Sequence, residues 1–197
     1  FHALEAHQCL LERRRGGETG IAAVRAVKGD AIRMAELAGE WSSELFAAAR
    51  RCMPGAPEDT AAWKPGMDSA AYLLEHNDGL RSAVIIANGL AGHFASAVRL
   101  KSQAEPVATW FRLQDGPPYG HFAYLVRAID ETIHARKAAY PVERTLLTTG
   151  ILDRVMHSLA NGSVRYETPE LAVAYQPADW PYANRPDSPL HLPYGQA

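Results

Sequence analysis

The segment AAYLLEHNDGLRSAVIIAN, residues 70–88, constrains the fold more than any other part of the sequence. Two largely apolar runs flank Asn77-Asp78-Gly79, and an Asp-Gly pair supplies the positive φ angles that tight hairpin turns need. Two further strand-like runs follow at residues 93–101 and 106–114, after short connections. Because short connections join neighbouring strands in opposite directions, the sequence predicts an antiparallel sheet.

Helical patterns dominate the last third of the chain. The spacing predicts a helix over about residues 119–136, with an apolar stripe expected to face the sheet, formed by Phe122, Leu125, Val126, Ile129 and Ile133. A second helix is expected to start near Pro141 and to end at Asn161-Gly162. A short strand, SVRYE, follows it.

The order of the expected elements defines the fold class. A first helix over about residues 1–15 and a strand over residues 21–29 precede the hairpin. Together with the two late helices, they predict an α+β fold with an open, mostly antiparallel sheet and helices packed on one face. No second set of core helices is evident, so we expect the other face to serve oligomerisation.

The chain is predicted to form one domain over residues 1–176. A helical insert is expected at about residues 30–67, with a cap at Ser42 or Ser43. Residues 177–197 are rich in proline and are expected to lie extended on a surface or on a partner chain.

Composition and charge exclude several classes of partner. The formal net charge is −2, and the only basic run lies beside acidic residues, so we expect no nucleic-acid or membrane partner. No apolar run approaches the roughly 18 residues that span a bilayer. Cys9 and Cys52 are too few for a disulfide framework, so we expect a reducing, cytoplasmic setting.

Three segments resemble the C-terminal domain of the Gfo/Idh/MocA family of oxidoreductases. FHALEAH is similar to the family's Gly-x-His-x-x-Asp helix start, with His2 on the histidine and Glu5 in place of the aspartate. The hairpin at residues 70–88 resembles the family's central hairpin, and residues 122–169 resemble its closing pair of helices. The insert and the proline-rich tail depart from the family pattern.

The resemblance implies a site and a reaction. His2 is the implied catalytic residue, because an imidazole near neutral pKa can handle the proton of a substrate hydroxyl. Glu5, one turn along the helix, is expected to orient His2 or to bind a hydroxyl of the substrate. Tyr119 and His121 are further candidates for lining a polyol pocket. The implied substrate is a sugar, a polyol or a related hydroxy compound.

The cofactor of such an enzyme, NAD or NADP, is bound in the family by an N-terminal Rossmann domain. The segment GGETG is too short for the dinucleotide fingerprint and follows a helix rather than a strand. We therefore expect the chain to act with a Rossmann part that it does not contain. The first residue, Phe1, agrees with processing or with a piece of a larger protein.

Two other functions stay open. A divergent domain of this kind can serve as a non-catalytic assembly or binding module. His2, Glu5, His7 and Cys9 also suggest a metal-dependent hydrolase or lyase that uses His2, although His7 points away from the other three on a regular helix. We assign no metal ligand on this basis.

Overall fold

The computed structural model describes residues 1–55, 63–90, 92–113, 116–117 and 119–179. Its main sheet has four antiparallel strands in the order β3-β2-β1-β6. Their bounds are Ile21–Lys28 for β1, Ala70–His76 for β2, Arg81–Ile86 for β3 and Tyr166–Glu167 for β6. The expected α+β class with an open antiparallel sheet is confirmed.

The hairpin of β2 and β3 forms as predicted, with Glu75 opposite Arg81 and Gly79 at a φ of +83°. Only glycine adopts this backbone conformation without strain, so the turn fixes which residues pair. Side chains alternate between the two faces of these strands, and the register therefore decides which residues meet each helix.

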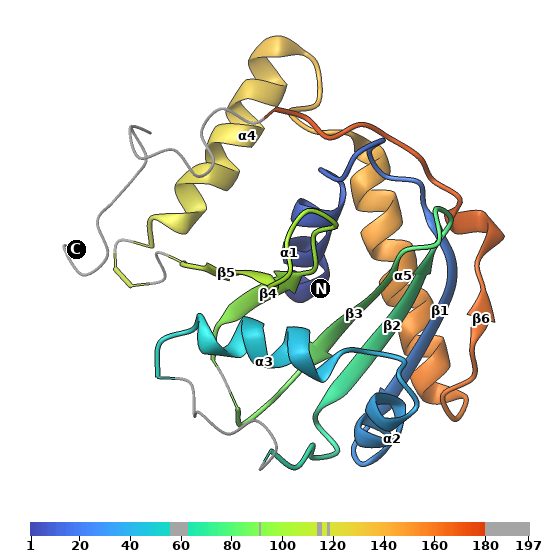
Figure 1. Ribbon diagram of the computed structural model, residues 1–197. Coiled ribbons are helices and arrows are strands. Elements are labelled where there is room, and N and C mark those ends of the chain that lie inside the picture. The colour runs from blue at the N-terminus through green and yellow to red at the C-terminus, as the bar shows by residue number, and fades with distance from the viewer. Residues whose placement is uncertain (56–62, 91, 114–115, 118, 180–197) are drawn as a thin grey trace.

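Two helices cover one face of the sheet. They are α1, His2–Leu11, and α5, Val142–Ala160, which lies behind the strands in Figure 1. Their buried side chains pack with alternate residues of the strands in one core cluster, which includes Leu4, Val24, Leu74, Leu147 and Ile151. Burial of such apolar surface is the main force that holds helix and sheet together.

The second face of the sheet differs from the expectation that it lies open for a second copy. The predicted insert forms α2, Ala31–Leu37, and α3, Ser43–Arg51, whose cap Ser42 accepts a hydrogen bond from Leu45 N–H. Part of the insert packs onto this face in a second core cluster, which includes Val27, Ile32, Trp41, Trp63 and Leu73. Sequence reasoning missed this cover because the two tryptophans lie outside the regular helices.

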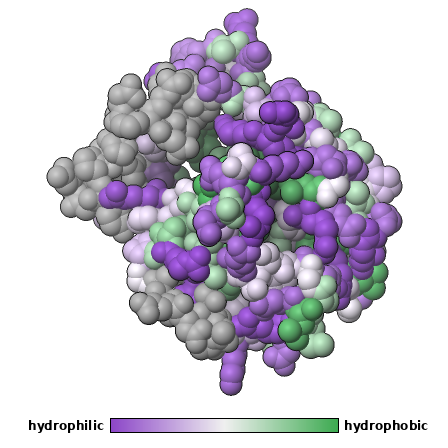
Figure 2. Space-filling model, viewed as in Figure 1, coloured by the Kyte–Doolittle hydropathy of each residue, from purple (hydrophilic) through white to green (hydrophobic). Residues whose placement is uncertain are grey.

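Ion pairs occupy further positions on this second face. Arg25 of β1 binds Glu40, and Arg165 binds Glu75 of β2, each with an N–O distance of 2.6 Å. Figure 2 shows that hydrophilic side chains prevail on the visible face of the molecule. The insert and these ion pairs therefore cover part of the face that was expected to be free of helices of this chain.

The other two strands do not extend the main sheet. They are β4, Phe94–Val98, and β5, Val107–Phe111, which pair with each other in a separate two-stranded sheet. This small sheet packs mainly on α3, and its strand β4 also contacts α1. The arrangement leaves a space between β4 and the edge strand β3.

The helix α4, His121–Ala135, forms as predicted, but its apolar stripe does not face the sheet. The five stripe residues from Phe122 to Ile133 expose between 51% and 67% of their surface. In Figure 1, α4 projects from the body of the domain. The prediction failed because an amphipathic pattern identifies the apolar face of a helix but does not identify the element that packs on it.

The remaining elements are short. A 3₁₀ turn, η1, Pro169–Leu171, follows β6, and Tyr175 pairs with Glu18 beyond it. The predicted proline-rich tail lies outside the described residues from position 180 onward.

Candidate functional site

A cavity of about 410 Å³ lies between α1, α3, the edge strand β3 and the small sheet. We call it the β3–β4 groove. Most of its lining is apolar and comes from Leu45, Phe46, Ile85, Phe94 and Phe111, among others. A concave apolar space of this size, with a few polar groups at one side, is the usual form of a site for a small molecule.

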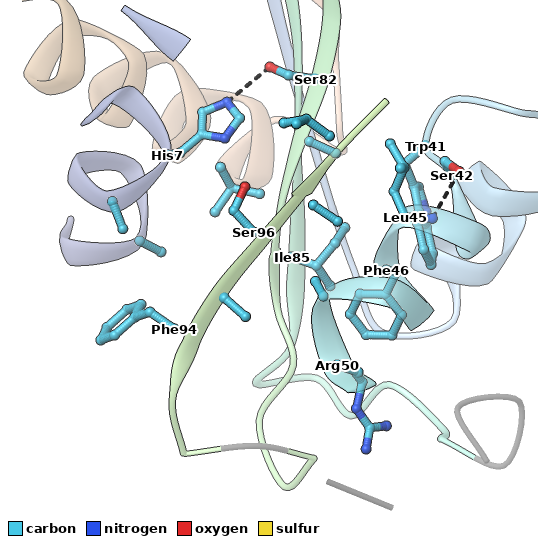
Figure 3. A pocket seen from close by; sticks show the side chains of 18 of the residues that line it. His7, Trp41, Ser42, Leu45, Phe46, Arg50, Ser82, Ile85, Phe94 and Ser96 are labelled. Carbon is cyan, nitrogen blue, oxygen red and sulfur yellow. Dashed lines mark hydrogen bonds between the residues drawn. The ribbon is translucent and has the colours of Figure 1, made fainter. Parts of the chain in front are cut away.

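One side of the groove carries a chain of polar side chains around Ser82. The Ser82 hydroxyl lies 3.0 Å from His7 Nε2 and 2.8 Å from His76 Nε2. On its other side, His76 Nδ1 lies 3.7 Å from Glu18 Oε1. We call Glu18, His76, Ser82 and His7 the Ser82 relay, and Figure 3 shows its outer end, where His7 meets Ser82.

The buried end of the relay is Glu18, which is 1% exposed. Its carboxylate accepts hydrogen bonds from Gln8 Nε2 at 2.6 Å and from the N–H groups of Thr19 and Gly20 at 2.8 and 2.9 Å. Arg14 adds a bidentate contact at 3.1 and 3.0 Å. Burial alone would raise the pKa of Glu18, but these donors and His76 outweigh it and hold the pKa well below its usual range.

The outer end of the relay is neutral. Burial, with a smaller contribution from the nearby His76 ring, lowers the pKa of His7 to about 4. At neutral pH the His7 imidazole is therefore uncharged, and it can donate a hydrogen bond from one ring nitrogen and accept one at the other.

The backbone of the segment GGETG does not have the form of a dinucleotide-binding turn. Gly17 and Gly20 lie against the backbone of the segment after η1, where a Cβ on Gly20 would come 2.4 Å from Leu171 O. The Glu18 carboxylate itself takes the N–H groups of Thr19 and Gly20. The Glu18 carboxylate thus takes the backbone N–H groups that a phosphate would need in a dinucleotide fingerprint.

The predicted catalytic residue, His2, lies exposed at the start of α1. Its ring makes an edge contact with Phe1, at a centroid distance of 5.7 Å. His2 is not among the residues that line the β3–β4 groove. The structure thus separates His2 from the groove, although both involve α1.

Glu5 is held by α5 rather than by His2. Its carboxylate accepts hydrogen bonds from Arg144 Nε and Nη2 at 3.1 and 3.0 Å, and from Thr148 Oγ1 at 2.7 Å. Arg144 also pairs with Glu12 at 2.7 Å, and Glu12 accepts from Tyr175 at 2.8 Å. Glu5 therefore anchors α1 to α5.

Tyr119 and His121 lie two positions apart at the start of α4, on either side of its N-cap Gly120. Tyr119 is 51% exposed and has a φ of 59°, and the His121 ring packs 4.3 Å from the Phe122 ring. Neither residue lines the β3–β4 groove.

The side chains proposed as a metal site for a hydrolase or lyase also point in different directions. His7 points to Ser82 and Glu5 to Arg144. Within the described ranges, no group of three or more His, Cys, Asp or Glu side chains has the geometry to hold a metal ion. Likewise, none of the helices in these ranges is both long and apolar enough to cross a bilayer.

Sequence reasoning missed the Ser82 relay. The sequence pattern placed His7 only in the metal alternative and favoured a structural role for His76, and it did not identify Glu18 or Ser82 as candidates. One local signal was present, because a carboxylate between glycines is well placed to accept backbone N–H groups. The contacts themselves join residues 75 and 6 positions apart, which only the fold brings together.

Comparison with known proteins yields no match to a family model, to a curated protein or to a solved structure.

Proposed function

We propose that this chain is the substrate-binding and oligomerisation part of a Gfo/Idh/MocA-like NAD(P)-dependent oxidoreductase. Its substrate is a sugar, a polyol or a related hydroxy compound, and an N-terminal Rossmann part outside this chain completes the enzyme. The observation that carries the proposal is the placement of α1. The helix is anchored by Glu5 and Glu12 to Arg144, while His2 at its first turn stays exposed.

This placement suits an active site between two parts of an enzyme. A histidine that serves a substrate held against another domain must project from its own domain, and its helix must not move. The Arg144 contacts and Thr148 supply that rigidity at Glu5, one turn from His2. Apart from the insert helices α2 and α3 and the separate pair β4–β5, the elements follow the order helix, strand, antiparallel hairpin, two helices and short strand, which supports the resemblance.

In the proposed reaction, this chain removes the hydroxyl proton of the substrate. When a secondary alcohol is oxidised to a ketone, its hydroxyl proton must leave, and the His2 imidazole accepts it. Glu5 acts through the helix, as a positioning residue. Because GGETG does not fit a dinucleotide, we derive no step on the cofactor from this chain.

The proposal is tested on the protein purified from its native source. Intact mass and N-terminal sequencing show whether a Rossmann segment precedes Phe1 or copurifies with the chain. NADH fluorescence then measures dinucleotide binding, and a panel of sugars, polyols and hydroxy acids is screened for reduction of NAD or NADP. We expect binding by the two-part protein and none by residues 1–197 alone.

The variant His2→Asn is expected to lower kcat by 10²-fold or more, by the usual contribution of an acid–base group, and to leave dinucleotide binding unchanged. His157→Asn is the matched control, since His157 is an exposed histidine on α5. Absence of any dinucleotide-binding part, or equal activity of both variants, would refute the oxidoreductase proposal.

One observation favours the alternative of a non-catalytic assembly module. The exposed stripe of α4 offers a continuous apolar helix face, and exposed apolar patches of this kind commonly mark interaction sites. Under this alternative, substitutions on α4 abolish association in sedimentation experiments, while His2→Asn has no effect in any assay.

A further inference from the structure

The rest of the described chain leaves one face of α4 uncovered. Ala128 is the one residue of α4 that is buried. More than half of the surface is exposed in each of the five residues that form the α4 stripe, which are Phe122, Leu125, Val126, Ile129 and Ile133. An isolated helix of 15 residues is only marginally stable in water, because most helical stability comes from packing of the apolar face. We therefore expect a partner to pack on the α4 stripe.

The apolar surface continues from α4 onto the start of α5. A cavity of about 310 Å³ lies between the two, lined by Leu125 and Ile129 on one side and by Tyr140 and Val142 on the other. Tyr140 and Val142 are exposed, as is Leu146, one turn beyond Val142 on α5. We call these three residues and the α4 stripe the α4–α5 patch. Its eight residues expose on the order of 800 Å² of surface, which is about what each partner buries in a stable interface.

The charges of α4 lie away from the stripe. At 100° per residue, Arg127, Asp130 and Glu131 all project outside the sector that the stripe occupies. Arg127 pairs with Glu131 and Asp130 with His134, each at 3.3 Å. Covering the α4 stripe therefore buries apolar surface without burying one of these charges. The stripe offers nothing that would select a strongly acidic or basic partner.

The spacing of the stripe reads the same in both directions along the helix. From Phe122, the next positions follow after four, three and four residues, at Val126, Ile129 and Ile133. A twofold axis over the middle of this series places Phe122 opposite Ile133 of a second copy, and Val126 opposite Ile129. A surface that matches itself in this way is the requirement for a closed contact between two identical chains.

We propose that two copies of this chain associate through the α4–α5 patch, with their α4 helices antiparallel across a twofold axis. A second copy is the occupant because the patch has the area of a complete interface, a stripe without charges and a spacing that is complementary to itself. Association then occurs on α4 and not on the second face of the main sheet, part of which the insert covers.

This contact is independent of the oxidoreductase proposal. The α4–α5 patch does not include His2 or Glu5, and the association requires neither a dinucleotide nor a substrate. It is measured on the chain alone and without turnover, so failure of one proposal does not imply failure of the other.

Sedimentation equilibrium of the full chain over a range of concentrations is the first test, and we expect a reversible dimer. The double variant Val126→Glu, Ile129→Glu brings four carboxylates together at the twofold axis and is expected to weaken association at least 100-fold. The control is Met34→Glu, Leu37→Glu, which changes two exposed apolar residues of α2 and should leave association unchanged. Circular dichroism verifies that both variants are folded.

A monomer at every concentration of the unmodified chain overturns the proposal, whatever else covers the stripe. Equal dissociation constants for the α4 variant and the α2 control also overturn it, because association would then use another surface.

A second test determines the orientation of the two helices. The variants Phe122→Cys and Ile133→Cys are oxidised separately and as a mixture, and the linked peptides are identified by mass spectrometry. The antiparallel contact predicts a disulfide between positions 122 and 133 in the mixture and little self-linking in either variant alone. Self-linking at 122 or at 133 that exceeds the mixed link would contradict the twofold arrangement.

Discussion

Arg144 of α5 bridges Glu5 of α1 and Glu12, the C-cap of that helix, with N–O distances of 3.0 Å to Glu5 and 2.7 Å to Glu12. The Glu12 side chain is 5% exposed and the Arg144 side chain 14% exposed, so these two charges lie largely out of water, whereas the Glu5 side chain is 28% exposed. The contact joins the first helix of the domain to its longest described helix.

Removal of the Arg144 guanidinium by Arg144→Met is expected to lower the free energy of unfolding by about 3 kcal/mol, because Glu5 loses its counter-charge and the buried Glu12 keeps only the more exposed Arg13, 2.7 Å away. Urea denaturation followed by circular dichroism measures the change. Arg154→Met is the matched control on the same helix, since the Arg154–Glu170 pair is exposed and contributes less than about 1 kcal/mol. Equal effects of the two variants would contradict the buried bridge.

The depressed pKa of His7 predicts how stability depends on pH. The unfolded chain binds a proton to this histidine near pH 6.5, whereas the folded chain does so near pH 4. The unfolded state is therefore favoured as the pH falls from 6.5 to 4, by up to about 3 kcal/mol from this group. His7→Gln should remove this part of the pH dependence in urea denaturation at several pH values. His157→Gln, at an exposed position, should retain it.

The turn around Glu18 requires glycine at position 20. Gly20 has a φ of +85°, and a Cβ there would lie 2.4 Å from Leu171 O and 2.5 Å from Val173 N, which are backbone atoms. Gly20→Ala should therefore lower the free energy of unfolding by about 2 kcal/mol or more. Gly39→Ala has a similar φ of +71° but open space around it, so only the backbone cost of about 1 kcal/mol applies. Thermal denaturation of both variants checks the difference, and equal melting temperatures would contradict it.

The apolar stripe of α4 is expected to contribute little to the stability of the isolated domain. Leu125 and Ile129 are each 51% exposed, so the double variant Leu125→Gln, Ile129→Gln should change the free energy of unfolding by less than about 0.5 kcal/mol per site. Leu147→Ala, at a fully buried position on α5, should cost about 2–5 kcal/mol in the same urea experiment. A large loss of stability in the α4 variant would show that the stripe is packed within the domain after all.

Local chemistry made several elements predictable. The Asp-Gly turn imposed the hairpin of β2 and β3, and the cap at Ser42 and the start near Pro141 followed from which backbone groups a helix end leaves free. Each of these signals acts between residues that are close in sequence, so it can be recognised without knowing the rest of the fold.

The partners of each face were not predictable. The stripe of α4 was expected to face the sheet and is exposed. The second face of the sheet was expected to serve oligomerisation, and Trp41 and Trp63 of the insert pack on part of it. The free energy of hydrophobic burial depends on the apolar area removed from water and not on which element removes it. An apolar pattern in one element therefore does not identify the element that packs on it.

The sequence by itself determined the α+β class, the antiparallel hairpin and the helical ends, because propensity, turn chemistry and periodicity are properties of neighbouring residues. Only the tertiary structure decided that Ser82 lies within hydrogen-bond distance of both His7 and His76 beside a largely apolar groove, with Glu18 3.7 Å beyond His76. The physical reason is distance along the chain. Contacts between α1, the glycine turn and the hairpin depend on how the sheet register and the helix packing orient three separate segments at once.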